Sequence, residues 1–286
     1  MSPMTSATCR AGLLVCTLLA LVRAGIAQDS PSPLGRGGDN TALARFGNAV
    51  VFYLSFDRHE LAEITAGSPE PQRDRWAEFL KARPDPYISG VFGHSLLSGP
   101  YTLSYVSLAR TRLGACGAVA LWLRGQTLHH RGEYYWPIRL HVAGSHSLMF
   151  GRMGDPRNDE KLYAYLQHGA HHATAVMGSM ADWQPDAWHL VVVNWDRTGV
   201  ELSLDGQSPV RSALREPLPA ADPGEFRVTV NSPTDETIAM DELLILSVPL
   251  ASADIAWLQQ AHASLDKPPA GRVRIRPRSF RQTGSS

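Results

Sequence analysis

The clearest pattern of apolar and polar positions in the chain predicts two adjacent antiparallel strands within WHLVVVNWDRTGVELSLDG, residues 188–206. From Leu190 to Trp195 all residues but one are apolar, which is typical of a central strand buried on both faces. The turn from Asp196 to Gly199 ends in a residue that is able to take a positive φ. From Val200 to Leu204 apolar and polar residues alternate, so the returning strand is expected to bury one face and expose the other. The segment therefore predicts a hairpin of a β-sandwich.

Three further segments accompany this hairpin in order along the chain. VVFYLSFD, residues 50–57, is an apolar strand that ends in Phe-Asp, and GVFGHSLLSG, residues 90–99, begins and ends in glycine. MDELLILSVPLASADIAWL, residues 240–258, joins an Asp-Glu strand to a short helix that Ser252 caps. Together the four segments resemble the LamG-like, concanavalin A-like jelly-roll domain of the lectin and glucanase superfamily. The resemblance covers about residues 48–262, with Ser95 in place of the usual alanine and Val248-Pro249 in place of the usual Arg-Ala.

The resemblance implies an all-β fold, a two-sheet antiparallel jelly-roll β-sandwich with short peripheral helices. The apolar periodicity by itself predicts many strands separated by turn-forming residues, which is the spacing of a sandwich. RDRWAEFLKA, residues 73–82, predicts a short helix because Trp76, Phe79 and Leu80 fall on one face. The other predicted strands cover residues 49–56, 101–106, 117–124, 136–142, 147–152, 161–168, 172–177, 226–231 and 237–247.

The first 27 residues predict a secretory signal peptide, because Arg10 precedes a largely apolar run of twelve residues and a small residue ends the segment at Ala27. A membrane span needs about 20 residues, so we expect no span after cleavage near Ala27, with an uncleaved anchor as the alternative. Residues 28–47 are expected to form a flexible lead-in, residues 48–262 the jelly-roll domain, and residues 263–286 a basic, disordered tail. The mature chain is expected to be secreted or to lie in the periplasm or cell envelope.

Charge and cysteine content exclude further classes of protein. Beyond residue 27 the chain has 25 basic and 27 acidic residues, so nothing predicts a nucleic-acid partner. Cys116 is the one cysteine beyond the leader, so a disulfide within the mature chain is not expected. The domain is therefore expected to depend on its hydrophobic core for stability.

Catalytic patterns of enzymes with this fold are missing from the sequence. Retaining glycosidases on such a fold resemble one another in an E-x-D-x-x-E strand, which brings two carboxylates within about 5 Å of each other. Here Asp241 and Glu242 are adjacent and should face opposite sides of a strand. Neither a G-x-S-x-G elbow nor an H-E-x-x-H helix is found. We therefore expect no catalytic residue and no enzyme activity; the alternative is a divergent glycoside hydrolase or polysaccharide lyase.

Two predicted strands carry a candidate ligand-binding surface. In KLYAYLQH, Tyr163 and Tyr165 share the face opposite the core, and in WPIRLHV, Arg139 and His141 point outward while Trp136 points to the core. If both strands belong to the concave sheet, aromatic rings and polar groups line one groove. That mixture favours carbohydrate, because rings pack on sugar faces while polar groups bind hydroxyls. Aromatic packing between strands is the alternative interpretation of the tyrosines.

The resemblance also implies a structural calcium site. Members of the superfamily bind calcium near the opening Phe-Asp and the final Asp-Glu, and Asp57 and Asp241 occupy these positions. The alternative is that Asp241 only accepts hydrogen bonds at strand ends. No other cofactor is expected.

The expected function is recognition or adhesion without catalysis, with a glycan or another cell-surface polymer as partner. The alternative outside the enzymes is a structural cell-envelope protein that binds a protein partner.

Overall fold

The computed structural model describes residues 45–108, 113–125, 134–153, 160–169, 172–184, 186–219, 224–233 and 238–265. The predicted signal peptide, most of the predicted lead-in and most of the basic tail lie outside these residues. The described residues all belong to one compact unit. Within them, no helix combines the length and the apolar character that crossing a membrane would require.

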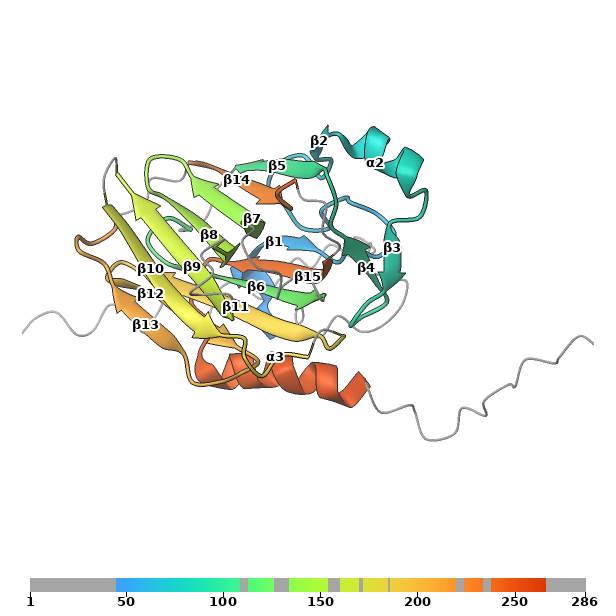
Figure 1. The fold of residues 1–286 in the computed structure, drawn as a ribbon. Coiled ribbons are helices and arrows are strands. Elements are labelled where there is room, and N and C mark those ends of the chain that lie inside the picture. Colours follow the sequence, from blue (N-terminus) through green and yellow to red (C-terminus); the bar gives the residue numbers. More distant parts are fainter. Residues whose placement is uncertain are drawn as a thin grey trace, which may run out of the picture. The chain divides into compact units, whose positions relative to one another are not determined.

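The described strands form two antiparallel sheets that pack as a jelly-roll β-sandwich, as the sequence predicts (Figure 1). The strands of the eight-stranded sheet are β1 (Val50–Leu54), β3 (Tyr87–Ser89), β4 (His94–Leu97), β6 (Gly117–Arg124), β11 (His189–Asp196), β12 (Gly199–Leu204), β13 (Val210–Ala213) and β15 (Ala239–Leu246). Their order is β13-β12-β11-β6-β15-β4-β3, and β1 also pairs with β15. The strands of the seven-stranded sheet are β2 (Gln72–Asp74), β5 (Thr102–Leu108), β7 (Tyr135–Val142), β8 (His146–Arg152), β9 (Lys161–His168), β10 (His172–Ser179) and β14 (Glu225–Val230). Their order is β10-β9-β8-β7-β14-β5-β2.

The predicted hairpin is formed by β11 and β12, which pair from Val191–Leu204 to Asp196–Gly199. One prediction about its turn is wrong, because Gly199 is not among the residues with positive φ. A Cβ atom at this position would lie 2.6 Å from the guanidinium of Arg211, which is bound to Asp196. A larger residue at this position would have to displace the Arg211 side chain from Asp196.

Both faces of β11 are buried, as its apolar run predicts. On the inner face, Val191, Val193 and Trp195 belong to the core between the two sheets. On the outer face, Leu190 and Val192 belong to a second apolar cluster. This cluster includes residues of helix α3 (Ser252–Leu265), so the helix covers the outside of the eight-stranded sheet (Figure 1).

Helix α3 also closes over the start of the described chain. Its Asp254 carboxylate lies 2.7 Å from the Arg45 guanidinium, and Trp257 makes an edge contact with Phe46 just before the short helix η1 (Gly47–Ala49). The sequence predicts a helix that ends near Leu258, whereas α3 extends to Leu265. The helix therefore covers the centre of the outer face of the eight-stranded sheet, so we take the outer face of the seven-stranded sheet as the candidate binding face.

Strand β7 differs from its prediction at its first residues. A register shift lies between Tyr135 and Ile138 where β7 pairs with β8. Tyr135 is 1% exposed and belongs to the core, whereas Trp136 is only half-buried. The expectation that Trp136 faces the core is wrong because the bulge shifts the alternation by one residue.

Strand β15 lies in the middle of the eight-stranded sheet although it is the last strand in the sequence. It pairs with β6, β4 and β1, and Val50 lies opposite Leu246. Its pairing with β6 shifts register between Asp241 and Leu244, and Glu242 takes a φ of 55°. The two adjacent acids therefore lie on a bulge instead of a regular strand.

Candidate functional site

The outer face of the seven-stranded sheet carries a row of side chains that crosses several strands. Arg139 on β7 lies opposite Met149 on β8, which lies opposite Tyr165 on β9. Arg139 is exposed, and Met149 and Tyr165 are half-buried. Since neighbouring strands are about 4.8 Å apart, Arg139 and Tyr165 are separated by roughly 10 Å across the sheet. An arginine and a tyrosine ring thus flank a partly apolar strip on one face.

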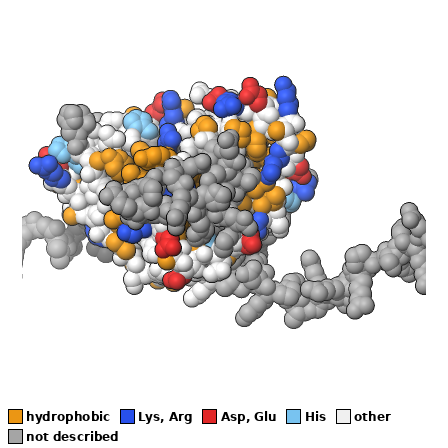
Figure 2. All heavy atoms as spheres, viewed as in Figure 1, with side chains coloured by type: hydrophobic (Ala, Val, Ile, Leu, Met, Phe, Trp, Pro, Cys, Tyr) orange, Lys and Arg blue, Asp and Glu red, His pale blue; other side chains and the backbone are white. Residues whose placement is uncertain are grey.

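A second row lies beside the first. His141 on β7 is opposite Ser147 on β8, which is opposite Gln167 on β9. His141 is exposed, and its Nδ1 lies 2.8 Å from the Ser147 hydroxyl, which restrains the ring. The two rows together offer groups that donate and accept hydrogen bonds beside an aromatic ring. Figure 2 shows one face of the molecule, on which hydrophobic side chains lie beside basic ones.

The two tyrosines of β9 differ in exposure. Tyr163 lies opposite Gly151 on β8 and Met177 on β10, and only 6% of it is exposed. Leu162 and Leu166 on the other face of β9 are fully buried in the core. Tyr165 therefore offers the more accessible ring, and Tyr163 offers little surface to a ligand.

Asp57 and Asp241 lie at the other candidate site, where they bind the turn between β3 and β4. Asp241 Oδ2 accepts hydrogen bonds from the backbone amides of Val91 and Phe92, at 2.6 and 3.2 Å. Asp57 Oδ1 accepts one from the amide of His94, at 2.7 Å. These bonds fix the backbone of the turn to the bulge of β15 and to the loop after β1.

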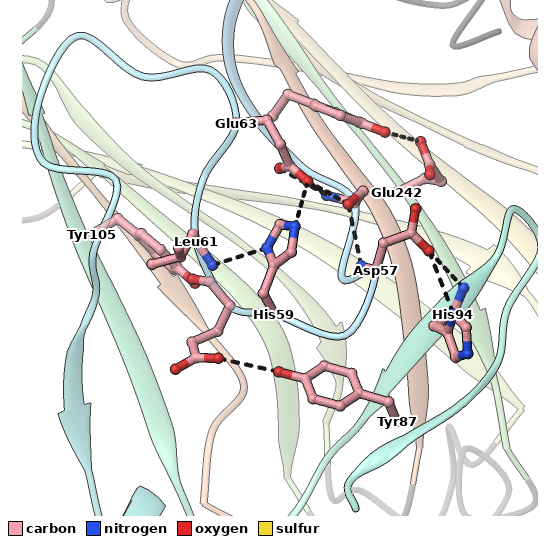
Figure 3. A network of polar contacts seen from close by, with 11 residues as sticks. Asp57, His59, Leu61, Glu63, Tyr87, His94, Tyr105 and Glu242 are labelled. Carbon is pink, nitrogen blue, oxygen red and sulfur yellow. Dashed lines mark hydrogen bonds and ion pairs between the residues drawn. The ribbon is translucent and has the colours of Figure 1, made fainter. Parts of the chain in front are cut away.

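Two more acids, which the sequence analysis did not assign to a site, lie near these aspartates. Glu242 Oε2 accepts a hydrogen bond of 2.7 Å from the Tyr53 hydroxyl, and Glu63 accepts hydrogen bonds from the amide and hydroxyl of Ser55. Figure 3 shows Glu63, Asp57 and Glu242 gathered between the loop after β1 and β15. We call Asp57, Glu63, Asp241 and Glu242 the acidic cluster.

Burial raises the pKa values of three acids of this cluster, and repulsion between carboxylates adds to the effect for Asp241 and Glu242. The pKa of Glu242 is raised to about 8, chiefly by burial and also by the nearby Asp57 and Glu63 carboxylates, while the hydrogen bond from Tyr53 acts in the opposite direction. The pKa of Asp241 is raised by burial and by Glu242, although the two amides of the turn act in the opposite direction. Burial also raises the pKa of Glu63. Part of the cluster is therefore expected to hold protons at neutral pH.

The acidic cluster only partly matches the ligands that calcium prefers. Asp241 is fully buried, and its Oδ1 accepts no hydrogen bond from the described residues, so one hard oxygen is left for a cation. The other oxygen of Asp241 and one of Asp57 are bound to amides. Among the described residues, no three His, Cys, Asp or Glu side chains are placed to hold a metal ion. Calcium at Asp57 and Asp241 thus stays a prediction, and further ligands would have to come from backbone and water.

Thermal unfolding tests this prediction. A cation that binds the native state alone stabilises it, so calcium at ten times its dissociation constant is expected to raise Tm by about 3 °C relative to EDTA. The measurement is differential scanning calorimetry of the wild type and of Asp57→Asn, in which the rise should shrink. Identical melting of the wild type in calcium and in EDTA would show that these aspartates serve the turn alone.

Comparisons with known proteins agree with the fold. No family model matches the chain, and no curated protein matches it by sequence. Among solved structures, it is similar to the botulinum neurotoxin serotype D binding domain, with a TM-score of 0.56, 10% identity and coverage of 77% of this chain and 52% of that one. The receptor binding domain of botulinum neurotoxin mosaic serotype C/D gives the same TM-score and identity, with coverage of 74% and 51%.

A third similar structure is the botulinum neurotoxin serotype D ligand binding domain in complex with N-acetylneuraminic acid. Its TM-score is 0.53 and its identity 12%, with coverage of 77% of this chain and 52% of that one. The chain thus spans about half the length of the structures it matches. At such identities the likeness establishes the β-sandwich fold and nothing finer.

Proposed function

We propose that this protein is a non-catalytic recognition module that binds carbohydrate on the outer face of the seven-stranded sheet. The observation that carries the proposal is the row Arg139, Met149 and Tyr165, beside His141 and Ser147. The opposite outer face is covered by α3, so the row lies on the sheet face that the helix leaves open.

The chemistry of this row suits a sugar ring. The face of an aromatic ring packs against the C–H groups of a pyranose, while polar side chains bind its hydroxyls. Tyr165 supplies the ring, and Arg139 and His141 supply hydrogen bonds on the same face. Since strands rather than loops carry these side chains, the surface is rigid before the ligand arrives, which lowers the entropic cost of binding.

The similar structures support a binding role in a general way. Their descriptions name receptor binding and ligand binding domains, one of them in complex with N-acetylneuraminic acid. The LamG-like resemblance supports carbohydrate as the ligand. The predicted signal peptide supports export of the protein to the cell surface or beyond. Recognition of a protein partner through the same face is the second candidate, because a similar sandwich is described as a receptor binding domain.

The contacts of the acidic cluster favour a structural role over catalysis. Asp57 and Asp241 each accept hydrogen bonds from backbone amides, and Glu63 and Glu242 each accept one from a hydroxyl. These bonds tie three segments of chain together. Release of reducing ends from a panel of polysaccharides by the purified protein, abolished in Glu242→Gln, would instead favour the hydrolase alternative.

Affinity electrophoresis in gels that contain polysaccharides tests the binding proposal. Tyr165→Ala is expected to weaken the retardation of the protein by about tenfold in dissociation constant, because stacking of one ring contributes about 1 to 1.5 kcal/mol. Tyr165→Phe keeps the ring and should bind like the wild type. His141→Ala should weaken binding less, since its ring contributes one hydrogen bond.

Far-UV circular dichroism of each variant checks that the sandwich is intact. Retardation of Tyr165→Ala equal to that of the wild type would remove the proposed surface. Retention of a protein ligand but of no glycan would favour the second candidate.

A further inference from the structure

A pocket of about 370 Å³ opens between helix α2 (Trp76–Ala82) and the turn that follows β4. Phe79, Ala82 and Pro100 give it apolar walls, and Arg75, Glu78 and Arg83 line it with charged side chains. Its volume lies at the lower end of the range for small-molecule sites. The pocket is therefore suited to a single small ligand rather than to a long polymer. It is also distinct from the row on β7, β8 and β9.

The apolar wall of the pocket is firmly packed. The Phe79 ring lies 4.7 Å from the Tyr101 ring and 5.7 Å from the Trp76 ring, and Tyr101 is fully buried. A Cβ atom at Gly99 would lie 2.5 Å from the Phe79 ring, so the glycine allows the turn to approach it. Because neighbours hold Phe79 on several sides, the wall needs little rearrangement when a ligand binds.

The charged side chains leave the pocket with an excess of positive charge. Arg75 lies 3.6 Å from Glu78 in an exposed ion pair, which is weak. Arg83 uses its backbone N–H to bind the Phe79 carbonyl, and its guanidinium forms no ion pair with any residue that the structure describes. The lining of the pocket therefore includes two guanidinium groups and one carboxylate. Arg75, which precedes α2, also takes a φ of 56°, an unfavourable backbone conformation.

We infer that this pocket binds a pyranose that carries a carboxylate, such as a hexuronic acid or a sialic acid. The arginines would bind the carboxylate, because guanidinium matches its geometry with two parallel hydrogen bonds. Glu78 would accept a hydrogen bond from a hydroxyl, and the exposed Ala82 and half-buried Pro100 would contact the C–H groups of the ring, with the buried Phe79 ring supporting them from beneath. The inference rests on the proposed function only in choosing a carbohydrate; the pocket and its charges stand independently of Tyr165.

The binding test titrates ¹⁵N-labelled full-length protein with N-acetylneuraminate, D-glucuronate, D-glucose and sulfate in separate NMR experiments. We expect both acidic sugars to shift the amide signals of Arg75 to Arg83 and those of Ser98, Gly99 and Tyr101. Glucose has the ring without the charge and should bind at least about tenfold more weakly. Sulfate has charge without a ring and should also bind more weakly. The two acidic sugars distinguish a sialic acid site from a uronic acid site by their relative affinity.

Arg83→Gln tests the assignment within the pocket. It is expected to weaken binding of the better acidic sugar by about tenfold, because it removes a charge-assisted pair of hydrogen bonds. Lys81→Gln is the matched control, since it removes a positive charge two residues away, in the last turn of α2, at a position that does not line the pocket. A charge effect acting at a distance would weaken binding equally in both variants, and this result would overturn the inference.

The remaining outcomes separate the pocket from the sheet surface. Shifts confined to amides of β7, β8 and β9 would contradict the pocket while supporting the proposed function. Shifts at α2 that persist in Tyr165→Ala would support the pocket even if the sheet surface proved inactive. Equal affinity for sulfate and for the acidic sugars would mean that the pocket holds any anion, and no shift with any probe would mean that it holds none. Either result would overturn the inference.

Discussion

Replacing Trp195 by alanine is expected to lower the free energy of unfolding by about 4 kcal/mol, the typical cost of truncating a fully buried aromatic ring. Trp195 has no exposed surface and lies in the core between the two sheets, with the ring of His146 5.4 Å away. Its indole nitrogen donates no hydrogen bond to any described residue, so the loss would come from packing. The measurement is the midpoint and slope of urea denaturation, followed by circular dichroism.

The matched control is Trp257→Ala on helix α3. Trp257 is half-buried and packs on the edge of Phe46 and against the guanidinium of Arg45. Its removal leaves less of a cavity, so we expect a loss of about 1 kcal/mol. Equal losses in the two variants would mean that the Trp195 side chain does not lie in the core between the sheets.

Between pH 6.5 and 8.5, the wild-type protein is expected to lose about 2 kcal/mol of stability that the variant Glu242→Gln retains. The cause is the pKa of Glu242, which burial raises to about 8 from an ordinary value of 4.5. The folded protein then holds a proton that the unfolded chain has released. The stabilisation that protonated Glu242 gives the folded state is complete below about pH 4.5 and is lost as the pH rises through 8. Glutamine keeps an oxygen for the Tyr53 hydroxyl but does not ionise.

This pH window separates Glu242 from a buried histidine that acts in the opposite direction. Burial lowers the pKa of His146 to about 4, so its contribution to stability is complete above about pH 6.5 and is lost as the pH falls toward 4. Urea denaturation at pH 6.5, 7.5 and 8.5 gives the three free energies needed. Glu225→Gln, which removes an exposed glutamate on β14, should show the wild-type dependence. A flat profile in the wild type would contradict the assignment to Glu242.

Much of the fold could be predicted because apolar periodicity reports burial directly. The hairpin of β11 and β12 was predictable since each of its faces packs against a different apolar layer. The helix at Trp76 and Phe79 was predictable for the same reason, because both side chains pack on Tyr101. Strands β2 and β13 were missed, since their exposed residues are ordered by hydrogen bonds to β5 and β12 rather than by burial.

The candidate sites were less accessible to sequence reasoning. Arg139 and Tyr165 could be placed on outward faces, but the order of strands that brings them into one row depends on the whole topology. Glu63 and Glu242 were missed as members of a cluster because a bulge in β15, which alternation does not reveal, brings Glu242 near Asp57. The pocket beside α2 combines residues 75–83 with residues 98–100, and no spacing rule connects these segments.

The central place of β15 bears on how the protein is made. Val50 and Leu246, which lie opposite each other, are nearly two hundred positions apart in the chain, so their meeting requires a large loop to close. During synthesis, the edges of β1 and β6 that pair with β15 have no partner until translation has passed residue 246. The nascent sandwich therefore carries open strand edges through most of its synthesis, and those edges are what a chaperone would have to shield from other chains.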